Sequence, residues 1–221
     1  EQSLRKIPLE QFEDLISYIN KNIKDNKPIS VLGASKGAEY ALNLASKYSE
    51  IDNLILIAPS SYNFAGLDFK DYGSSWTYKG KELPYIDIKK SSFNSFLKNI
   101  IVPNIIKSPI SYKETYSSAI EKDSSSQEKL IPVKDVNANI LMIVGEDDLM
   151  WDSLAMADKI KEQNPKAKIY SYKEAGHIFA SNGVLNLGKI RIATGGTTES
   201  NDKAESESRK TIDAFLKENH K

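Results

Sequence analysis

The pentapeptide Gly33-Ala34-Ser35-Lys36-Gly37 constrains the fold of this chain more than any other feature. It directly follows the apolar run at residues 29–32, and apolar residues at helical spacing follow it, namely Ala38, Ala41, Leu42, Ala45 and Tyr48. A G-x-S-x-G sequence between a strand and a helix holds its serine on a tight, strained turn, with the hydroxyl above the sheet edge. We expect a Cβ at Gly33 or Gly37 to collide with the neighbouring strand or helix. The sequence therefore predicts a strand, a sharp turn with Ser35 at its apex, and a helix.

A nucleophilic serine needs a general base, and the chain has only two histidines, His177 and His220. His220 is the penultimate residue of a charged tail, where chain ends often fray. His177 lies in a loop just after the strand-like run at residues 168–172. A lone histidine can also be a hydrogen-bonded structural residue. The order Ser, Asp or Glu, His is the order of an α/β-hydrolase triad, so we favour His177 as the base.

The third member of such a triad should be an acid at a strand end between Ser35 and His177. Residues 139–144 are the strongest buried-strand signal in the chain, and they run into Glu146, Asp147 and Asp148. We favour Asp148, because its position three residues after Gly145 carries the carboxylate past the strand end toward the histidine loop. Asp147 is the alternative, although it is better suited to hold the turn or the next helix. A hard-cation site at the three acids is disfavoured because they lack the spacing of a calcium loop.

These features predict an α/β fold of the α/β-hydrolase type, with a mostly parallel sheet flanked by helices. In that fold the second oxyanion donor comes from a loop well before the nucleophile. Only residues 1–28 precede the first strand here, and most of them read as one amphipathic helix with an apolar face of Phe12, Leu15, Ile16, Ile19 and Ile23. We therefore expect the N-terminal strands to be absent from this sequence, which would be a piece of a longer enzyme.

Several short segments together resemble one family, the C-terminal catalytic domain of acyl-CoA thioester hydrolases and bile-acid-CoA:amino acid N-acyltransferases. The resemblance rests on the order and co-occurrence of segments spread along most of the chain. These are residues 7–13 (IPLEQFE), the S-K-G elbow at 33–39 (GASKGAE), 58–60 (APS), 75–81 (SWTYKGK) with 83–85 (LPY), 131–133 (IPV), 145–148 (GEDD) with Trp151, and 175–177 (AGH).

The resemblance implies specific roles at the matching positions. Ser35 matches the family's nucleophile, Asp148 its acid and His177 its base, and the backbone N–H of Lys36 would be one oxyanion donor. The amino acid acyltransferases carry cysteine at the nucleophile position, whereas the thioester hydrolases carry serine. Because the chain has Ser35 and no cysteine, the resemblance points to hydrolysis of acyl-CoA thioesters. Another carboxylesterase or peptidase activity, the acyltransferase activity, and a catalytically silent acyl-binding or interaction domain are the alternatives.

Composition restricts the other function classes. The 30 basic and 30 acidic residues balance, so no net charge favours nucleic acid or an anionic membrane, and no apolar run is long enough to span a membrane. The absence of cysteine excludes disulfides and zinc–thiolate sites, and it is compatible with a cytoplasmic protein. We expect no cofactor and no metal, a small acyl-CoA or ester substrate, and an oligomeric state that the sequence leaves open.

We expect one catalytic domain over residues 1–221, with a long insertion at about residues 61–132. The insertion is rich in aromatic residues between Tyr62 and Tyr85, and it has no continuous strand–helix alternation. Connections of this length are often lids or caps, and acyl substrates need a partly closed apolar site. A small satellite core that packs on the sheet edge is the alternative.

Smaller expectations concern single residues and the tail. Trp151 could line an acyl pocket or belong to the core. The side chain of Lys36 is expected to be solvated, with contact to a CoA phosphate as the alternative. The serine-rich residues 123–126 should form an exposed turn. Residues 195–202 should be a turn before a final helix whose apolar face is Ile212, Phe215 and Leu216.

Overall fold

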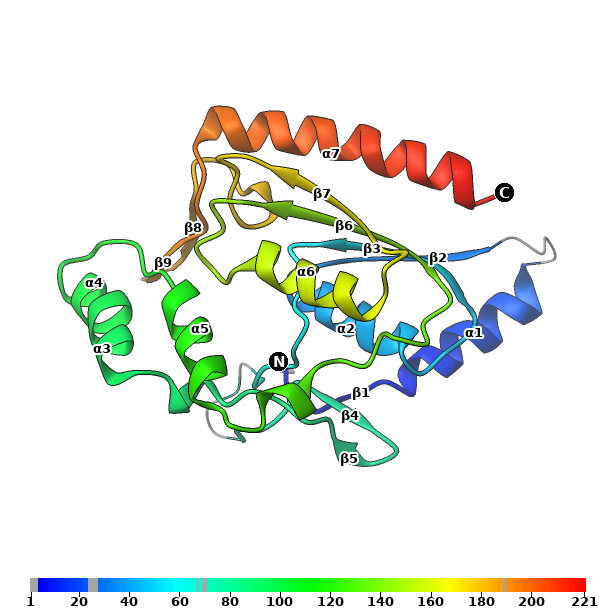
Figure 1. Cartoon of the computed structure of the whole chain (residues 1–221), viewed down its shortest axis with the longest axis horizontal. Coiled ribbons are helices and arrows are strands. Elements are labelled where there is room, and N and C mark those ends of the chain that lie inside the picture. The colour runs from blue at the N-terminus through cyan, green and yellow to red at the C-terminus, as the bar shows by residue number, and fades with distance from the viewer. Residues whose placement is uncertain (1–3, 24–27, 67, 69–70, 189) are drawn as a thin grey trace.

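A computed structural model describes residues 4–23, 28–66, 68, 71–188 and 190–221. Its centre is a parallel four-stranded sheet (Figure 1) with the order β2 (Ile29–Ala34), β3 (Ile51–Ile57), β6 (Asn139–Gly145) and β7 (Lys168–Tyr172). Three of these strands, β2, β6 and β7, occur where the sequence analysis predicts them. The predicted α/β class, with a mostly parallel sheet flanked by helices, is confirmed.

The apolar runs explain which strands lie at the centre of the sheet. β6 is a nearly continuous apolar sequence, and β3 is apolar from Leu54 onward. Most residues of both strands are buried, as expected for strands covered on both faces. β2 and β7 lie at the edges of this sheet and expose more of their residues, including Leu32 and Tyr170. The three βα units place every strand of the sheet with its carboxyl end at the same edge.

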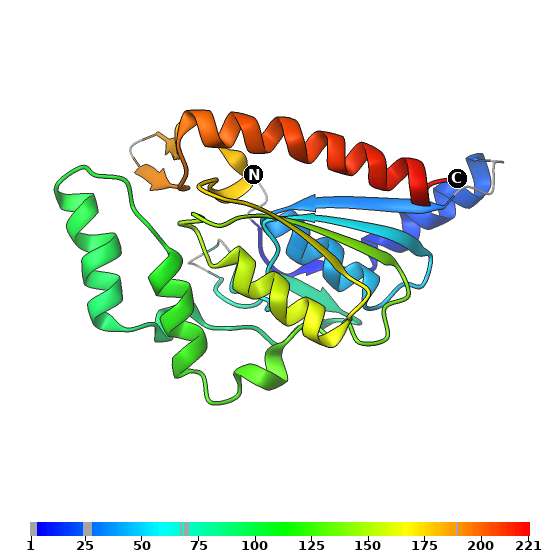
Figure 2. The same ribbon diagram turned by 45° about the horizontal axis from the view of Figure 1, so that its top comes forward.

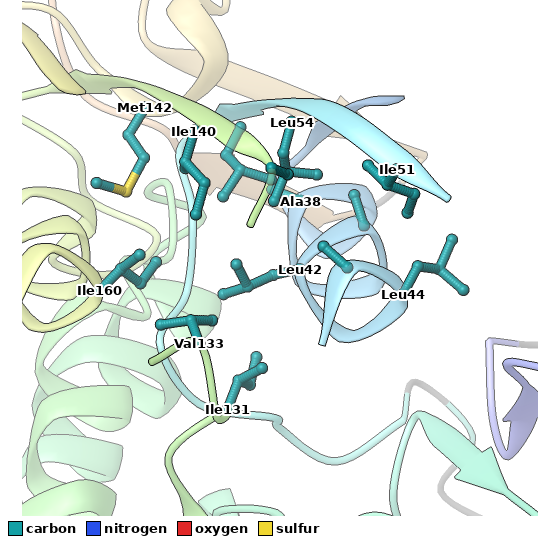
Figure 3. Packing of buried hydrophobic residues seen from close by; sticks show 14 of the residues in the cluster. Ala38, Leu42, Leu44, Ile51, Leu54, Ile131, Val133, Ile140, Met142 and Ile160 are labelled. Atoms are coloured by element: carbon teal, nitrogen blue, oxygen red, sulfur yellow. The ribbon is translucent and has the colours of Figure 1, made fainter. Parts of the chain in front are cut away.

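Helices cover both faces of the sheet (Figures 1 and 2). α2 (Lys36–Ala45) and α6 (Ser153–Gln163) pack on one face, and α7 (Thr198–Asn219) lies along the other. Figure 3 shows the larger core, where Leu42 of α2 and Ile160 of α6 meet side chains such as Leu54 and Met142 of the sheet. On the opposite face, the predicted apolar stripe of α7 packs against Ile55, Leu141 and Ile143 through Phe215, Ile212 and Leu216.

The start of α7 corrects one sequence expectation. The helix begins at Thr198, so residues 198–202 are helical and the turn ends earlier than predicted. The reason is a capping box: Thr197 accepts a bond from the Ser200 N–H, and the Ser200 hydroxyl accepts one from the Thr197 N–H. These reciprocal bonds satisfy amides that would otherwise lack partners in the first turn.

The amino-terminal helix α1 (Gln11–Asn22) forms, but its apolar face is narrower than predicted. Phe12 and Ile16 are buried, whereas Leu15 and Ile23 are more than half exposed. Phe12 packs on the ring of Tyr48, which follows α2, at a centroid distance of 5.3 Å. Because the helix is covered along one side only, a two-residue stripe is sufficient, and the wider stripe inferred from periodicity is wrong.

A small second sheet and the long insertion precede β6 in the chain. β1 (Ile7–Pro8), β4 (Trp76–Tyr78) and β5 (Lys81–Glu82) form the small sheet. The helical elements are then η1 (Ile88–Lys90), α3 (Phe93–Phe96), the π-turn η2 (Leu97–Ile101), α4 (Val102–Ile105), α5 (Lys113–Lys122) and η3 (Ser126–Lys129). After β7 come η4 (His177–Phe179) and the hairpin β8 (Val184–Leu187) and β9 (Ile190–Ala193).

The inner part of the insertion forms a satellite core, which was the alternative to a cap. Tyr62, Phe64 and Tyr116 are buried there together with Trp151 and Met156 from the neighbourhood of α6. The outer part, from α3 to α4, projects at the end of the molecule toward which the strands of the central sheet point (Figures 1 and 2). Whether this part covers an active site stays a prediction.

Within the described part of the chain, no helix is long and apolar enough to cross a membrane.

The serine-rich stretch is a turn, but its first residue is buried. The carboxylate of Asp123 accepts bonds from the N–H and hydroxyl of Ser125, and it lies 2.6 Å from Lys129 Nζ. These bonds, chiefly the one from Lys129, hold the pKa of Asp123 below its usual range. The expectation of an exposed turn holds for Ser124 and is wrong for Asp123.

Candidate active site

Ser35 occupies the junction between β2 and α2 in a strained backbone conformation. Its φ of 55° and ψ of −122° lie outside the regions that non-glycine residues ordinarily adopt. The turn is fixed on both sides, because the Ser35 N–H donates to the Ile57 carbonyl and the Ser35 carbonyl accepts from Ala38 and Glu39. The chain reverses so sharply that the side chain of Ser35 stands at the carboxyl edge of the sheet.

The structure brings three predicted site residues together at that edge. His177 Nε2 lies 2.8 Å from Ser35 Oγ, and His177 Nδ1 lies 2.8 Å from Asp148 Oδ2. Ser35 and His177 are 142 positions apart in sequence, so only the fold produces this contact. The side chains of Asp148 and His177 are almost completely buried. This arrangement of hydroxyl, imidazole and carboxylate has the geometry needed for proton transfer from the serine to the histidine.

The carboxylate of Asp148 is oriented by the backbone that follows β6. Its second oxygen, Oδ1, accepts bonds from the N–H groups of Met150 at 2.8 Å and Trp151 at 3.2 Å. These two bonds leave Oδ2 free to face His177. The charge of a buried carboxylate is thus compensated by backbone donors on one side and by the imidazole on the other.

The imidazole of His177 is held by the loop between β7 and α7. The backbone N–H of His177 donates to the Thr194 carbonyl at 2.7 Å. The His177 ring packs edge-on against the ring of Trp151 at a centroid distance of 4.7 Å. Trp151 is itself buried and donates from its indole N–H to the Pro59 carbonyl. Trp151 therefore belongs to the core and also fixes the plane of the histidine ring, a role that the sequence did not reveal.

The other candidate residues lie elsewhere. Asp147 is exposed and accepts from the Gly196 N–H at 2.8 Å, while Glu146 accepts from the Ser171 hydroxyl at 2.7 Å. The three acids at 146–148 therefore point to three different partners. The ring of His220 lies 2.7 Å from the Ser30 hydroxyl, at the start of β2 and so at the opposite edge of the sheet.

The two glycines of the elbow are not equivalent, which corrects the sequence expectation. A Cβ at Gly33 would lie 2.2 Å from the Gly37 carbonyl oxygen, whereas a Cβ at Gly37 would meet open space. Gly37 is already inside α2 and exposed, so its missing side chain faces solvent. The close approach of strand and helix backbones therefore requires glycine only at Gly33.

We expect Gly33→Ala and Gly37→Ala to change the free energy of unfolding in opposite directions. Gly33→Ala should destabilise the protein by about 3 kcal/mol or more, because backbone atoms must separate to admit the methyl group. Gly37→Ala should stabilise it by about 0.5–1 kcal/mol, since alanine is the better helix former. Urea unfolding of the two variants measures both values. Equal destabilisation by the two substitutions would contradict the geometry of the turn.

The side chain of Lys36 is not solvated, so that expectation is wrong. Its amino group points inward and lies 2.9 and 2.8 Å from the two carboxylate oxygens of Glu39, which has no exposed surface. Glu39 also accepts from the indole N–H of Trp76 at 2.7 Å and the backbone N–H of Phe64 at 3.1 Å. The bonds from Trp76 and Phe64 to Glu39 therefore tie α2 to the insertion, whereas the buried ion pair with Lys36 lies within the helix. Glu39 could have been noticed as an acidic residue among the apolar positions of α2.

Burial acts on both charges of this pair. Desolvation raises the pKa of Glu39 and lowers the pKa of Lys36, while their mutual attraction opposes both shifts. A carboxyl whose pKa is higher in the folded than in the unfolded protein takes up a proton on folding. Its contribution to the free energy of unfolding is therefore lost as the pH rises from the pKa of the group in the unfolded protein through its pKa in the folded protein. Lys36 limits this loss near neutral pH.

We expect Lys36→Met to destabilise the protein by about 3–5 kcal/mol at pH 7, because Glu39 would remain buried without its counter-ion. The loss should be smaller near pH 5, where the folded protein can bind a proton at Glu39. The double variant Lys36→Met/Glu39→Gln should recover much of the stability at pH 7, since it removes both charges. Urea unfolding at the two pH values measures this cycle. Additive losses in the double variant would show that the pair is not coupled.

Comparison with known proteins places the chain in a family. The family model described as BAAT / Acyl-CoA thioester hydrolase C terminal matches residues 7–220. The chain belongs to this family. The resemblance inferred from the elbow and the segments around it is therefore confirmed.

Individual relatives agree with the family match. The chain is 25% identical to human acyl-coenzyme A thioesterase 1 over 183 residues, which are 80% of this chain and 39% of that protein. It is equally similar to human mitochondrial acyl-coenzyme A thioesterase 2, with 80% of this chain and 34% of that protein covered. The chain thus spans less than two-fifths of the length of these relatives.

Solved structures show a more distant similarity. A putative lipase from Acinetobacter baumannii AYE has a TM-score of 0.44 and 15% sequence identity, with 95% of this chain and 68% of that chain covered. At this level the likeness carries no argument about substrate or mechanism.

Proposed function

We propose that this protein is a serine hydrolase that cleaves acyl-CoA thioesters to a free acid and CoA. The observation that carries the proposal is the contact of 2.8 Å between Ser35 Oγ and an imidazole whose other nitrogen faces the buried carboxylate of Asp148. Membership of the family supports acyl-CoA as the substrate class. The serine at the nucleophile position favours water over an amine as the acceptor.

In the first half of the reaction, Ser35 Oγ attacks the thioester carbonyl carbon as its proton passes to His177 Nε2. Asp148 holds Nδ1 in its protonated form and stabilises the imidazolium that results. When the tetrahedral intermediate collapses, the carbon–sulfur bond breaks and the proton on His177 Nε2 passes to the departing sulfur, so CoA leaves as a thiol and the imidazole is neutral again. The acyl group is then esterified to Ser35.

In the second half, water attacks the acyl-enzyme carbonyl and gives one proton to His177 Nε2. Collapse of the second intermediate releases the carboxylic acid, and the proton returns to Ser35 Oγ. Each half of the reaction therefore uses the same imidazole, first as base and then as acid.

The negative charge of both intermediates needs hydrogen-bond donors. The backbone N–H of Lys36 is the first amide of α2, where helix amides lack intrahelical acceptors and the helix dipole favours negative charge. Among the described residues, no acceptor is bonded to this N–H. We propose it as one donor of the oxyanion hole.

Turnover assays on three substrate classes test the proposal. We expect the protein to release CoA from acyl-CoAs and to hydrolyse p-nitrophenyl esters more slowly, with no cleavage of aminoacyl amides. Preference for esters or amides would indicate a carboxylesterase or a peptidase. Transfer of the acyl group to glycine or taurine would indicate an acyltransferase, and no turnover on any substrate would indicate a silent binding domain.

The lack of cysteine is the basis for proposing a cytoplasmic location.

A further inference from the structure

Two stretches of the chain contain no acidic residue, although the whole chain has 30. The first, residues 88–113, includes five lysines, namely Lys89, Lys90, Lys98, Lys107 and Lys113. The second, residues 175–198, includes Arg191 in the β8–β9 hairpin. In a chain with balanced charge, these stretches are local concentrations of positive charge.

The fold places both stretches at the same end of the molecule. Ile110 N–H donates to the Arg191 carbonyl at 2.8 Å, and Ala193 N–H donates to the Ile110 carbonyl at 2.8 Å. Figures 1 and 2 both show α3, α4 and the hairpin at the end where the strands of the central sheet point. We call this surface, formed by residues 90–107, 184–188 and 190–193, the basic apolar tip.

The basic apolar tip exposes large apolar side chains. Phe93 is 73% exposed, Ile105 74% and Ile106 66%. Others are at least two-fifths exposed: Phe96, Leu97 and Val102 in the same helical segment, and Leu185, Leu187 and Ile190 in the hairpin. Scattered exposed apolar residues are ordinary, but a group of this kind on adjacent elements marks an interaction surface.

Several of the nearby cations are available to a partner. Lys98 is within 3.8 Å of Glu114 and Lys113 within 3.4 Å of Asp152, both at partly or fully exposed positions where such pairs are weak. In the part of the chain that the structure describes, Lys90, Lys107 and Arg191 form no ion pair. The acids nearest to the tip therefore leave much of its positive charge uncompensated.

We propose that the basic apolar tip docks on the surface of an anionic lipid bilayer. The apolar side chains of α3, α4 and the hairpin would enter the boundary between headgroups and acyl chains, and the lysines would contact lipid phosphates. A bilayer accepts protruding apolar side chains without a matching shape. Lysine is depleted in protein–protein interfaces, so a surface whose cations are mostly lysine favours lipid over an acidic protein.

The tip is connected to the candidate active site by apolar structure. A cavity of about 520 Å³ lies between α3 and α5, lined among others by Phe93, Phe96, Ile100 and Tyr112. From there, a series of neighbouring aromatic rings leads to the site. The ring centroids are 6.5 Å apart for Tyr112 and Tyr116, 5.6 Å for Tyr116 and Trp151, and 4.7 Å for Trp151 and His177. If the proposed thioesterase function holds, docking would deliver a membrane-dissolved acyl chain to this side of the site. The docking itself does not depend on that function.

Vesicle co-sedimentation tests the proposal. We expect the protein to bind vesicles of phosphatidylcholine mixed with phosphatidylglycerol at least about tenfold more than vesicles of phosphatidylcholine alone, and to lose this preference at high salt. Ile105→Ser/Ile106→Ser and, separately, Lys90→Gln/Lys107→Gln should each reduce binding about tenfold. Leu15→Ser/Tyr18→Ser on α1 and Lys161→Gln/Lys166→Gln near α6 are matched exposed controls and should bind like the unaltered protein.

The outcomes separate docking from catalysis. Hydrolysis of a short, water-soluble acyl-CoA should be the same in all four variants, and their thermal unfolding midpoints should match that of the unaltered protein. Docking would be excluded by equal binding to both kinds of vesicle, or by equal losses in the tip and control variants. Binding to polyglutamate with no binding to vesicles would identify an acidic protein as the partner and would also overturn the proposal.

Discussion

Ser35→Ala is expected to reduce kcat for acyl-CoA hydrolysis by about 10⁴-fold or more, with little change in KM. Alanine keeps the size of the residue at the turn but removes the oxygen that would form the acyl-enzyme. His177→Ala should cause a loss of similar size, because the hydroxyl 2.8 Å from its Nε2 would then have no base. Steady-state release of CoA, followed with a thiol reagent, measures both.

The double variant shows whether the two residues act as one unit. Ser35→Ala/His177→Ala should be within about threefold of either single variant, because removing one member already prevents the shared step. Losses that multiply would mean that the two residues contribute separately. His220→Ala is the matched control, since the only other histidine lies at the opposite edge of the sheet, and it should retain full activity.

Asp148→Asn is expected to reduce kcat by about 10³–10⁴-fold while leaving the fold intact. An amide can still accept from the backbone N–H groups of Met150 and Trp151, so the loop should keep its shape. It cannot stabilise an imidazolium, however, and its NH₂ group would favour the wrong tautomer of His177. Stopped-flow or steady-state assays on the purified variant give the loss in kcat.

The neighbouring aspartate provides the control for this substitution. Asp147→Asn should keep activity within about threefold, because Asp147 is exposed and its bond from the Gly196 N–H can be made equally by an amide oxygen. If Asp147→Asn caused the larger loss, the assignment of the acid would be wrong. Thermal unfolding of both variants separates lost chemistry from lost folding.

The parts of the fold that depend on local apolar pattern could be predicted from the sequence. β6 is a short, nearly continuous apolar run, and β3 is such a run from Leu54 onward, as the interior of a parallel sheet requires. The turn at Ser35 is recognisable because few other sequences allow a strand to reverse directly into a helix. Since the carboxyl ends of parallel strands share one edge, residues that follow β2, β6 and β7 could be expected to meet there.

The features that could not be predicted depend on which surfaces meet. Periodicity gives α1 a wide apolar face, but only packing against the main core decides that Phe12 and Ile16 are the buried members. A lysine beside a nucleophile is expected in solvent unless a buried carboxylate compensates it, and Glu39 acts in this way only once the insertion covers α2. Likewise, the clash at Gly33 arises from the path of the next helical turn.

Covalent labelling with a fluorophosphonate tests the central claim most directly, because the reagent reacts only with a serine that a neighbouring base activates. We expect one phosphonyl group per molecule, located at Ser35 by peptide mass spectrometry. Labelling should be blocked by an excess of acyl-CoA and absent from Ser35→Ala and His177→Ala. Failure of the folded, unaltered protein to form this adduct, or an adduct on another serine, would contradict the assignment of Ser35 as the nucleophile.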